Sequence, residues 1–243
     1  MKYIAAIAMA VIIGGIAVAA PPKQGQMASG SQPAIKEQLA KVKQSVMDNR
    51  TQLQKYHWLE TTVVSVKGDS KKDEQKACRY AADGNIEKTP LGWQDAPKDM
   101  PGGLRGKVAK KKIGEMQDYM ERLKGLISHY VPPNPEMMQN SFQAGKVNLN
   151  MSSGGLAELT FRDYYKGGDS ITLGFDTASS RITSYNITSY LDGPEDVVTM
   201  ANQFSSLPSN ITYLQQTILT SKSKQIEIKT TNSQYELNNP NNP

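Results

Sequence analysis

The segment from Lys146 to Tyr235 constrains the fold most strongly, because short alternating runs follow one another with tight turns between them. Leu159 and Phe161 alternate with polar residues, and a Lys-Gly-Gly-Asp turn at 166–169 leads into the next run. Successive side chains of a strand point to opposite faces, so each run has an apolar and a polar face, as in an antiparallel sheet with one side in water. The pattern predicts strands at 146–151, 156–165, 169–176, 180–191, 196–204, 211–220 and 224–231.

An earlier pair of strands and several helices complete the predicted elements. The β-branched and aromatic residues of 56–67 predict a strand, and a turn precedes a second strand at 74–82. Apolar residues three or four positions apart predict amphipathic helices at 33–54 and 111–130. Asn134 is expected to cap a short third helix that runs through Phe142. A change in the parity of the apolar residues predicts a β-bulge near Thr183 or Ser184.

The two long helices each have one apolar stripe, which needs a surface to cover. The arrangement that satisfies both is an α+β fold in which the strands form one large curved antiparallel β-sheet, covered on one face by the two amphipathic helices. Hydrophobic residues make up 38% of the chain, so we expect a thin core.

The first residues have the features of an export signal. Lys2 precedes an uncharged apolar run, and Ala17-Val18-Ala19 fits a small-x-small cleavage site, so we interpret residues 1–19 as a signal peptide. A membrane anchor is the alternative. The expected location is therefore periplasmic, or secreted after cleavage. The remaining divisions are a flexible leader at 20–32, a single domain at 33–231 and a polar tail at 232–243.

The residues that carry common catalytic chemistry are scarce. His57 and His129 are the only histidines, and no H-E-x-x-H, P-loop, G-x-S-x-G or G-x-G-x-x-G motif occurs. Cys78 is the only cysteine, and its place in a predicted strand favours a buried, hydrophobic role over a reactive thiol. We predict no metal site, no cofactor and no enzymatic activity. A hydrolase with a dispersed site around one of the histidines is a weaker alternative.

The segment 86–110 is rich in proline and glycine, which predicts an irregular loop. It ends in a group of basic residues, in a chain whose formal charge is +5. The simpler interpretation is a solvated start to the following helix, and the alternative is a peripheral contact with a membrane surface. Nucleic acid is not an expected partner. The basic residues are Arg105, Lys107, Lys110, Lys111 and Lys112.

The order of these elements resembles the periplasmic lipoprotein carrier LolA and its LolB-like and RseB-like relatives. The resemblance rests on Ala34 to Val66 and on Asp169 to Tyr235, including the turn into a strand at 176–182 and the segment 205–213. It implies an incomplete β-barrel closed by helices, with a cavity that takes acyl chains. The insertion at 86–110 departs from the family pattern, and no family residue is assigned to a position here.

The leading hypothesis is a non-enzymatic carrier or sensor that binds a hydrophobic or lipid-like ligand, such as an acyl chain or a lipoprotein, between sheet and helices. The same side chains would equally fill a dry core. The alternative is an interaction module that binds another envelope protein through its sheet and has a closed core. An unfilled apolar cavity distinguishes the two. The predicted ligand-binding residues are Tyr56, Trp58, Met116, Met120, Leu123, Leu159, Phe161, Leu173 and Phe175.

Overall fold

The computed structural model describes residues 31–92, 103–152, 154–208 and 210–238. The predicted signal peptide, and the leader as far as residue 30, lie outside these ranges. The helices are α1 (Ser31–Leu53), α2 (Gly103–Ser128) and α3 (Pro135–Gln143). The strands are β1 (Tyr56–Val66), β2 (Asp69–Tyr80), β3 (Ile86–Leu91), β4 (Val147–Met151), β5 (Leu156–Arg162), β6 (Ser170–Asp176), β7 (Ile182–Tyr190), β8 (Val197–Ser206), β9 (Thr212–Ser221) and β10 (Ile226–Leu237).

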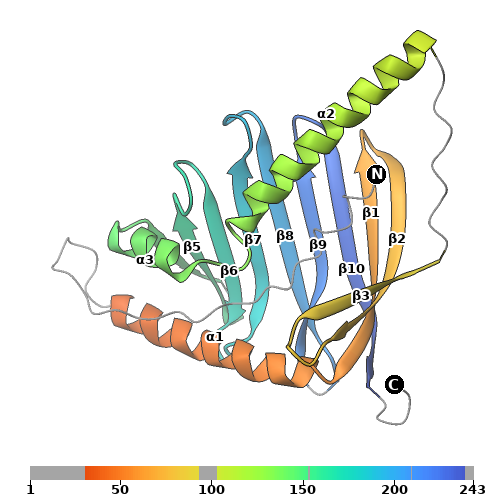
Figure 1. Cartoon of the computed structure of the whole chain (residues 1–243). Coiled ribbons are helices and arrows are strands. Elements are labelled where there is room, and N and C mark those ends of the chain that lie inside the picture. The colour runs from red at the N-terminus through yellow and green to blue at the C-terminus, as the bar shows by residue number, and fades with distance from the viewer. Residues whose placement is uncertain (1–30, 93–102, 153, 209, 239–243) are drawn as a thin grey trace.

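The strands form one antiparallel sheet in the order β3-β2-β1-β10-β9-β8-β7-β6-β5-β4. Consecutive strands are neighbours in the sheet, except that β3 and β4 lie at opposite edges, while the first strand, β1, pairs with the last, β10. β3 and β4 form the two edges, so the curved sheet remains an open barrel. Figure 1 shows all three helices on the same face of this sheet. The predicted α+β fold class, with an incomplete barrel and helices on one face, is confirmed.

The core lies between α2 and strands β5 to β9. Leu123 and Ile127 of α2 are fully buried, on the apolar stripe that the sequence pattern predicted. They meet the inward side chains of the sheet, which include Phe161 and Ile187 at 1% exposure. Burying a large apolar side chain stabilises a fold by about 1.5–3 kcal/mol. The α2 stripe is therefore the main attachment of the helices to the sheet.

Two buried tyrosines, Tyr119 on α2 and Tyr130 in the turn that follows it, add polar anchors to this attachment. The Tyr119 hydroxyl lies 2.9 Å from Asp196 Oδ1 and 2.5 Å from the Ser221 hydroxyl. The Tyr130 hydroxyl lies 2.5 Å from Asp169 Oδ2 and 2.7 Å from the Ser189 hydroxyl. These partners belong to the sheet strands or to the turns between them, so both tyrosine side chains face the sheet. Each tyrosine hydroxyl is hydrogen-bonded to a buried aspartate, and a buried carboxylate without such a partner would destabilise the core.

Several boundaries differ from the sequence prediction. Residues 86–91 form an edge strand, and α2 begins at Gly103, so only part of 86–110 is irregular or outside the described residues. Edge strands tolerate Pro90, because one side of an edge has no ladder to interrupt. The predicted polar tail from residue 232 is also wrong over its first part, because β10 continues to Leu237 and pairs there with Tyr56 of β1.

Two local predictions are confirmed. Asn134 caps α3, and its side-chain oxygen accepts a hydrogen bond from the backbone N–H of Glu136 at 2.8 Å. The bulge is also present, because Gly174 pairs with Ser184 while Phe175 pairs with Ile182, which leaves Thr183 unmatched. The bulge returns Ile182 and Tyr185 to the same buried face.

Gly174 lies beside this bulge and leaves no room for a side chain. A Cβ there would lie 2.2 Å from the Ser184 hydroxyl oxygen and 3.1 Å from that of Thr183. We expect Gly174→Ala to lower the free energy of unfolding by about 1–3 kcal/mol, measured by urea denaturation. Adding Ser184→Ala should restore part of the loss, because it removes the nearest atom. Full stability of the single variant would contradict this packing.

Candidate functional site

A cavity of about 150 Å³ lies between the C-terminal half of α1 and the inner face of the sheet. Its walls come from strands that are far apart in the sequence, because the β1–β10 pairing brings both ends of the chain to this side. The lining is Ser45, Val46, Met47, Asn49, Arg50 and Leu53 of α1, and Trp58, Glu60, Tyr80, Ile86, Lys88, Ile182, Phe204, Thr212, Leu214, Asn232 and Tyr235 of the sheet.

Three aromatic residues form one wall of the cavity. The Trp58 ring stacks on the Tyr235 ring, with centroids 5.4 Å apart and planes 9° apart. Tyr80 packs on Trp58 at the same centroid distance, with the ring tilted by 51°. The Trp58 indole N–H donates to the Asn232 side-chain oxygen at 3.1 Å. Burial raises the pKa of both Tyr80 and Tyr235, so these hydroxyls remain protonated at neutral pH.

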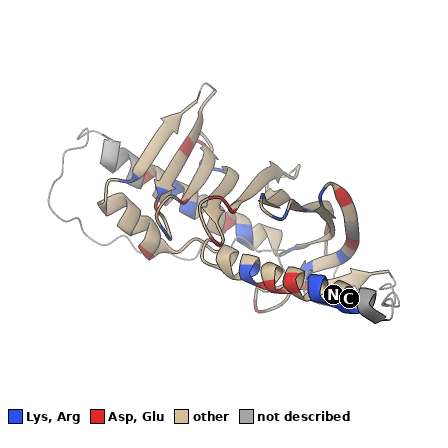
Figure 2. Cartoon of the chain, turned by 90° about the horizontal axis from the view of Figure 1, so that it is seen from above, with Lys and Arg blue, Asp and Glu red and all other residues tan. Residues whose placement is uncertain are grey.

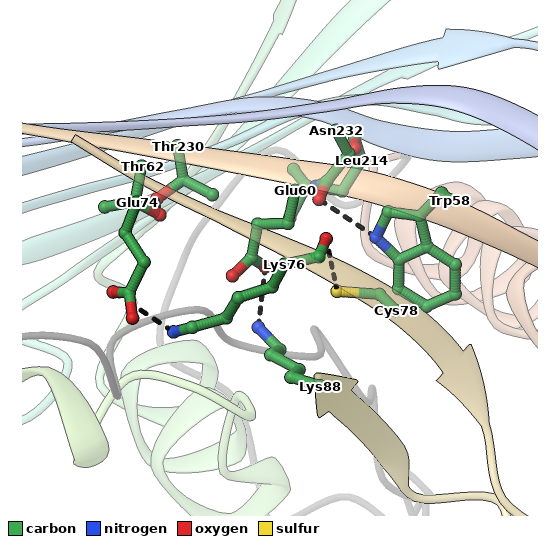
Figure 3. A network of polar contacts seen from close by, with 10 residues as sticks. All are labelled: Trp58, Glu60, Thr62, Glu74, Lys76, Cys78, Lys88, Leu214, Thr230 and Asn232. Carbon is green, nitrogen blue, oxygen red and sulfur yellow. Dashed lines mark hydrogen bonds and ion pairs between the residues drawn. The ribbon is translucent and has the colours of Figure 1, made fainter. Parts of the chain in front are cut away.

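A strip of buried charge lies on the inner face of β1, β2 and β3 (Figure 3). The Lys88 ammonium lies 2.6 Å from Glu60 Oε2, and Glu60 is only 3% exposed. Lys76, at 7% exposure, lies 3.4 Å from Glu74 Oε2. Buried charges are tolerated only when they are paired, so each ion pair offsets the loss of hydration. Glu60 and Lys88 belong to the cavity wall, which gives this apolar site a polar side.

Helix α1 covers the cavity but has few deeply buried side chains. Between residues 37 and 53, where its side chains are described, only Val42 is buried. Asn49 provides its clearest polar attachment: its amide donates to the Thr212 carbonyl oxygen at 2.5 Å, and its oxygen accepts from the Thr212 N–H at 2.6 Å. Arg50 donates to the Gly84 carbonyl oxygen at 3.4 Å. In the first half of the helix, Gln38 donates to the Ser180 hydroxyl at 3.3 Å, so the described part of α1 has polar attachments in both halves.

A second, smaller cavity of about 20 Å³ lies under the middle of α1, where there is room for about one water molecule. Val42 and Lys43 contribute to its wall from α1, and Leu173 and Tyr185 from the sheet. Its size is too small for an organic ligand, so the larger cavity is the candidate site.

The predicted ligand-binding residues are distributed over cavity and core. Trp58 lines the larger cavity and Leu173 the smaller one. Tyr56 and Met116 are half-buried and line neither. The other five are buried in the core cluster: Met120, Leu123, Leu159, Phe161 and Phe175.

Most cavity residues were absent from the sequence prediction. Glu60, Lys88 and Asn232 are polar residues in strands or in the predicted tail, where solvent exposure is the ordinary expectation. One signal was available in β1. Polar residues occupy some of the alternate positions whose side chains point inward, and the same set of positions includes the buried apolar residues Trp58 and Val64.

Cys78 lies next to the charged strip and is 1% exposed, as the sequence predicted. Burial, together with the nearby Glu60 carboxylate, raises the pKa of its thiol to about 11. We expect a disulfide reagent at pH 8 to react with Cys78 at least about 100-fold more slowly in the folded protein than in urea. The raised pKa also predicts a loss of stability as the pH rises from about 9 towards 11, because the unfolded chain ionises first. Equal thiol reactivity in the two states would contradict this burial.

The two histidines lie apart from the cavity. His129 stacks on Tyr165 with centroids 3.9 Å apart. His57 lies 3.7 Å from the exposed Glu236 carboxylate. Within the described ranges, no three of the His, Cys, Asp and Glu side chains form a group that could hold a metal ion.

The basic cluster lies on the N-terminal part of α2. Lys107, Lys110, Lys111 and Lys112 are exposed, while the side chain of Arg105 is outside the described part. Figure 1 shows this end of α2 extending past the sheet, and Figure 2 shows basic and acidic residues along the helix. Among the residues described, no helix is long and apolar enough to cross a membrane.

The fold and the cavity together define an open antiparallel half-barrel with helices on its concave face. No protein-family model and no curated protein matches the sequence. The structure is similar to that of a DUF1329 family protein from Desulfovibrio piger, with 7% identity, a TM-score of 0.38, and coverage of 83% of this chain and 93% of that one. It is also similar to a LolA superfamily protein from Nitrosomonas europaea, with 8% identity, a TM-score of 0.36, and coverage of 81% and 93%.

Proposed function

We propose that this protein binds a hydrophobic or lipid-like molecule in the cavity under α1 and acts as a non-enzymatic carrier or sensor in the periplasm, or outside the cell. The observation that supports this proposal is the cavity itself, which is walled by aromatic and aliphatic side chains with a few polar groups. Ligand sites have that composition, whereas an adaptor with a closed core has no need of the space.

The size of the cavity limits what enters without a change in structure. A cavity of about 150 Å³ accommodates a molecule the size of benzene, whereas drug-sized ligands occupy about 300–1,000 Å³. An acyl chain therefore requires α1 to move away from the sheet. The shallow burial of α1 favours this movement, because few apolar contacts would be lost.

The Asn49 attachment gives a prediction about this movement. We expect Asn49→Ala to lower the free energy of unfolding by about 1–3 kcal/mol, because it leaves the Thr212 backbone N–H and carbonyl without their partner. The same variant should take up a fluorescent fatty acid faster than the wild type in a stopped-flow experiment. Gln44→Ala is the control, because the hydrogen bond described for Gln44 goes to the exposed Asp48 on the same helix. Uptake at an unchanged rate would show that α1 does not control access.

The proposal is tested by native mass spectrometry of the full chain exported from a bacterial host, followed by organic extraction of bound molecules. A stoichiometric adduct is expected in the wild type and should be lost in Leu214→Trp, which fills the cavity. Leu156→Trp is the matched control, because Leu156 is 45% exposed and does not belong to the cavity lining. The proposal fails if the wild type has a clean apo mass and takes up neither fatty acid nor phospholipid when they are offered.

The second candidate function is an interaction module for another envelope protein. The observation that favours it is the open sheet edge at β4, where Met151 is 59% exposed. A strand of a partner would extend the sheet there through backbone hydrogen bonds. The outward backbone donors of β4 alternate with inward ones, and Ser152 donates inward to the Leu156 carbonyl oxygen, so the N–H of Met151 faces the free edge. Replacing Met151 with proline would remove that donor and should abolish partner capture while ligand uptake continues.

A further inference from the structure

Two buried polar atoms in the cavity wall have no hydrogen-bond partner in the described part of the chain. Among the residues that the structure describes, three buried side-chain oxygens lack a hydrogen bond: Glu60 Oε1, Ser141 Oγ and Thr212 Oγ1. Two of these three residues line the cavity under α1. Folded proteins pair the great majority of such groups, because an unpaired buried polar atom destabilises the folded state. Their coincidence with the cavity points to a bound group as the missing partner.

The chemistry of the two atoms limits that group. Glu60 Oε2 already accepts from the Lys88 ammonium, and the second oxygen of a carboxylate in such an ion pair can only accept a hydrogen bond (Figure 3). The missing partner of Glu60 must therefore donate. The Thr212 hydroxyl can donate or accept, since its backbone groups rather than its side chain bond to Asn49. An alcohol or an amine can donate to either residue.

An anionic head group fits this wall poorly. A carboxylate ligand has no proton to donate to Glu60 Oε1, and it would bring a second negative charge into a region of low dielectric. The Lys88 ammonium is already held by the other oxygen of Glu60 at 2.6 Å. The adjoining aromatic wall of Trp58 and Tyr80 favours an apolar body, and it also attracts cations through the ring faces.

We propose that Glu60 and Thr212 bind the polar end of an amphipathic ligand whose head group is a hydrogen-bond donor, an alcohol or an amine, and not a carboxylate. This inference rests on the proposed function, because it names the ligand class for the same cavity. The apolar body of the ligand lies against Trp58, Tyr80 and Leu214. A donor head group supplies the hydrogen bond that either oxygen lacks among the described residues.

A matched series of benzene-sized probes tests the head-group preference. Toluene, benzyl alcohol, benzylamine and benzoate differ mainly in the polar group, and each is titrated into the full chain by isothermal calorimetry. We expect benzyl alcohol or benzylamine to bind at least about 10-fold more tightly than toluene, and benzoate to bind most weakly. Toluene binding as tightly as the alcohol and the amine, or benzoate binding best, overturns the inference and leaves the proposed function standing. No binding of any probe, together with no lipid uptake, removes both.

Two variants separate a binding role from a structural one. Thr212→Val removes the unpaired hydroxyl without changing the shape of the side chain, so the melting temperature should stay equal or rise while benzyl alcohol binding weakens about 10-fold. Ser141→Ala is the control, because it removes an equally unpaired hydroxyl in α3, outside the cavity lining. It should leave binding of every probe unchanged. Identical binding in Thr212→Val and the wild type would overturn the role of Thr212.

Glu60→Gln tests the charge. It retains an accepting oxygen and similar volume but removes the negative charge, so benzylamine should lose about 10-fold in affinity, whereas toluene should bind as before. A far-UV and near-UV circular dichroism comparison establishes that the variant is folded. Unchanged benzylamine affinity in the folded variant would overturn the role of the Glu60 carboxylate.

Discussion

Replacing Asp169 with alanine should lower the free energy of unfolding by about 3–5 kcal/mol, the usual cost of breaking a buried charged network. Asp169 is 2% exposed. Its carboxylate accepts from the Tyr130 hydroxyl and from the backbone N–H groups of Tyr164, Tyr165 and Lys166. Alanine leaves these donors buried or half-buried without an acceptor, so the turn at 163–169 and the end of α2 both lose their attachment.

The measurement for Asp169→Ala is urea denaturation followed by circular dichroism. Asp192→Ala is the matched control, because Asp192 makes an exposed ion pair with Arg122 and should cost about 0–1 kcal/mol. Tyr130→Phe should cost less than Asp169→Ala, since Asp169 keeps its backbone donors. The double variant should cost less than the sum of the two single changes, because the orphaned tyrosine hydroxyl is absent from it. A loss below 1 kcal/mol in Asp169→Ala would contradict the network.

Replacing Phe161 with alanine should also cost about 3–5 kcal/mol, the range for removing a large buried aromatic side chain. Phe161 is 1% exposed on β5 and belongs to the core cluster under α2 and α3. The sequence predicted this residue in a ligand site, so the experiment also compares the two roles. A core residue is needed for stability, whereas a cavity residue is needed mainly for binding.

Leu156 of the same strand is 45% exposed, and Leu156→Ala should change the free energy of unfolding by less than about 0.5 kcal/mol. Phe161→Ala should keep its affinity for ligand once corrected for the folded fraction. A folded, stable Phe161→Ala that has lost ligand uptake would move the binding site from the α1 cavity into the β5 region.

The elements were largely predictable, because local patterns carry the information for them. The stripe through Leu123 and Ile127 predicted α2, and the alternation around Leu159 and Phe161 predicted β5. The bulge at Thr183 also followed from a local change of parity. The edge strand at 86–91 was missed, because Pro90 and the surrounding turn residues resemble a loop, and an edge strand needs only one partner.

Local sequence patterns specify the period of each segment, which is two for the strands and between three and four for the helices. These periods give each element one buried face and so specify the class of fold. The position of the candidate site depends instead on the tertiary structure. The pairing of β1 with β10 brings Glu60 and Trp58 beside Asn232 and Tyr235, residues more than 170 positions away in the chain. Pairing across such a distance depends on the register of the whole sheet, and no local pattern specifies it.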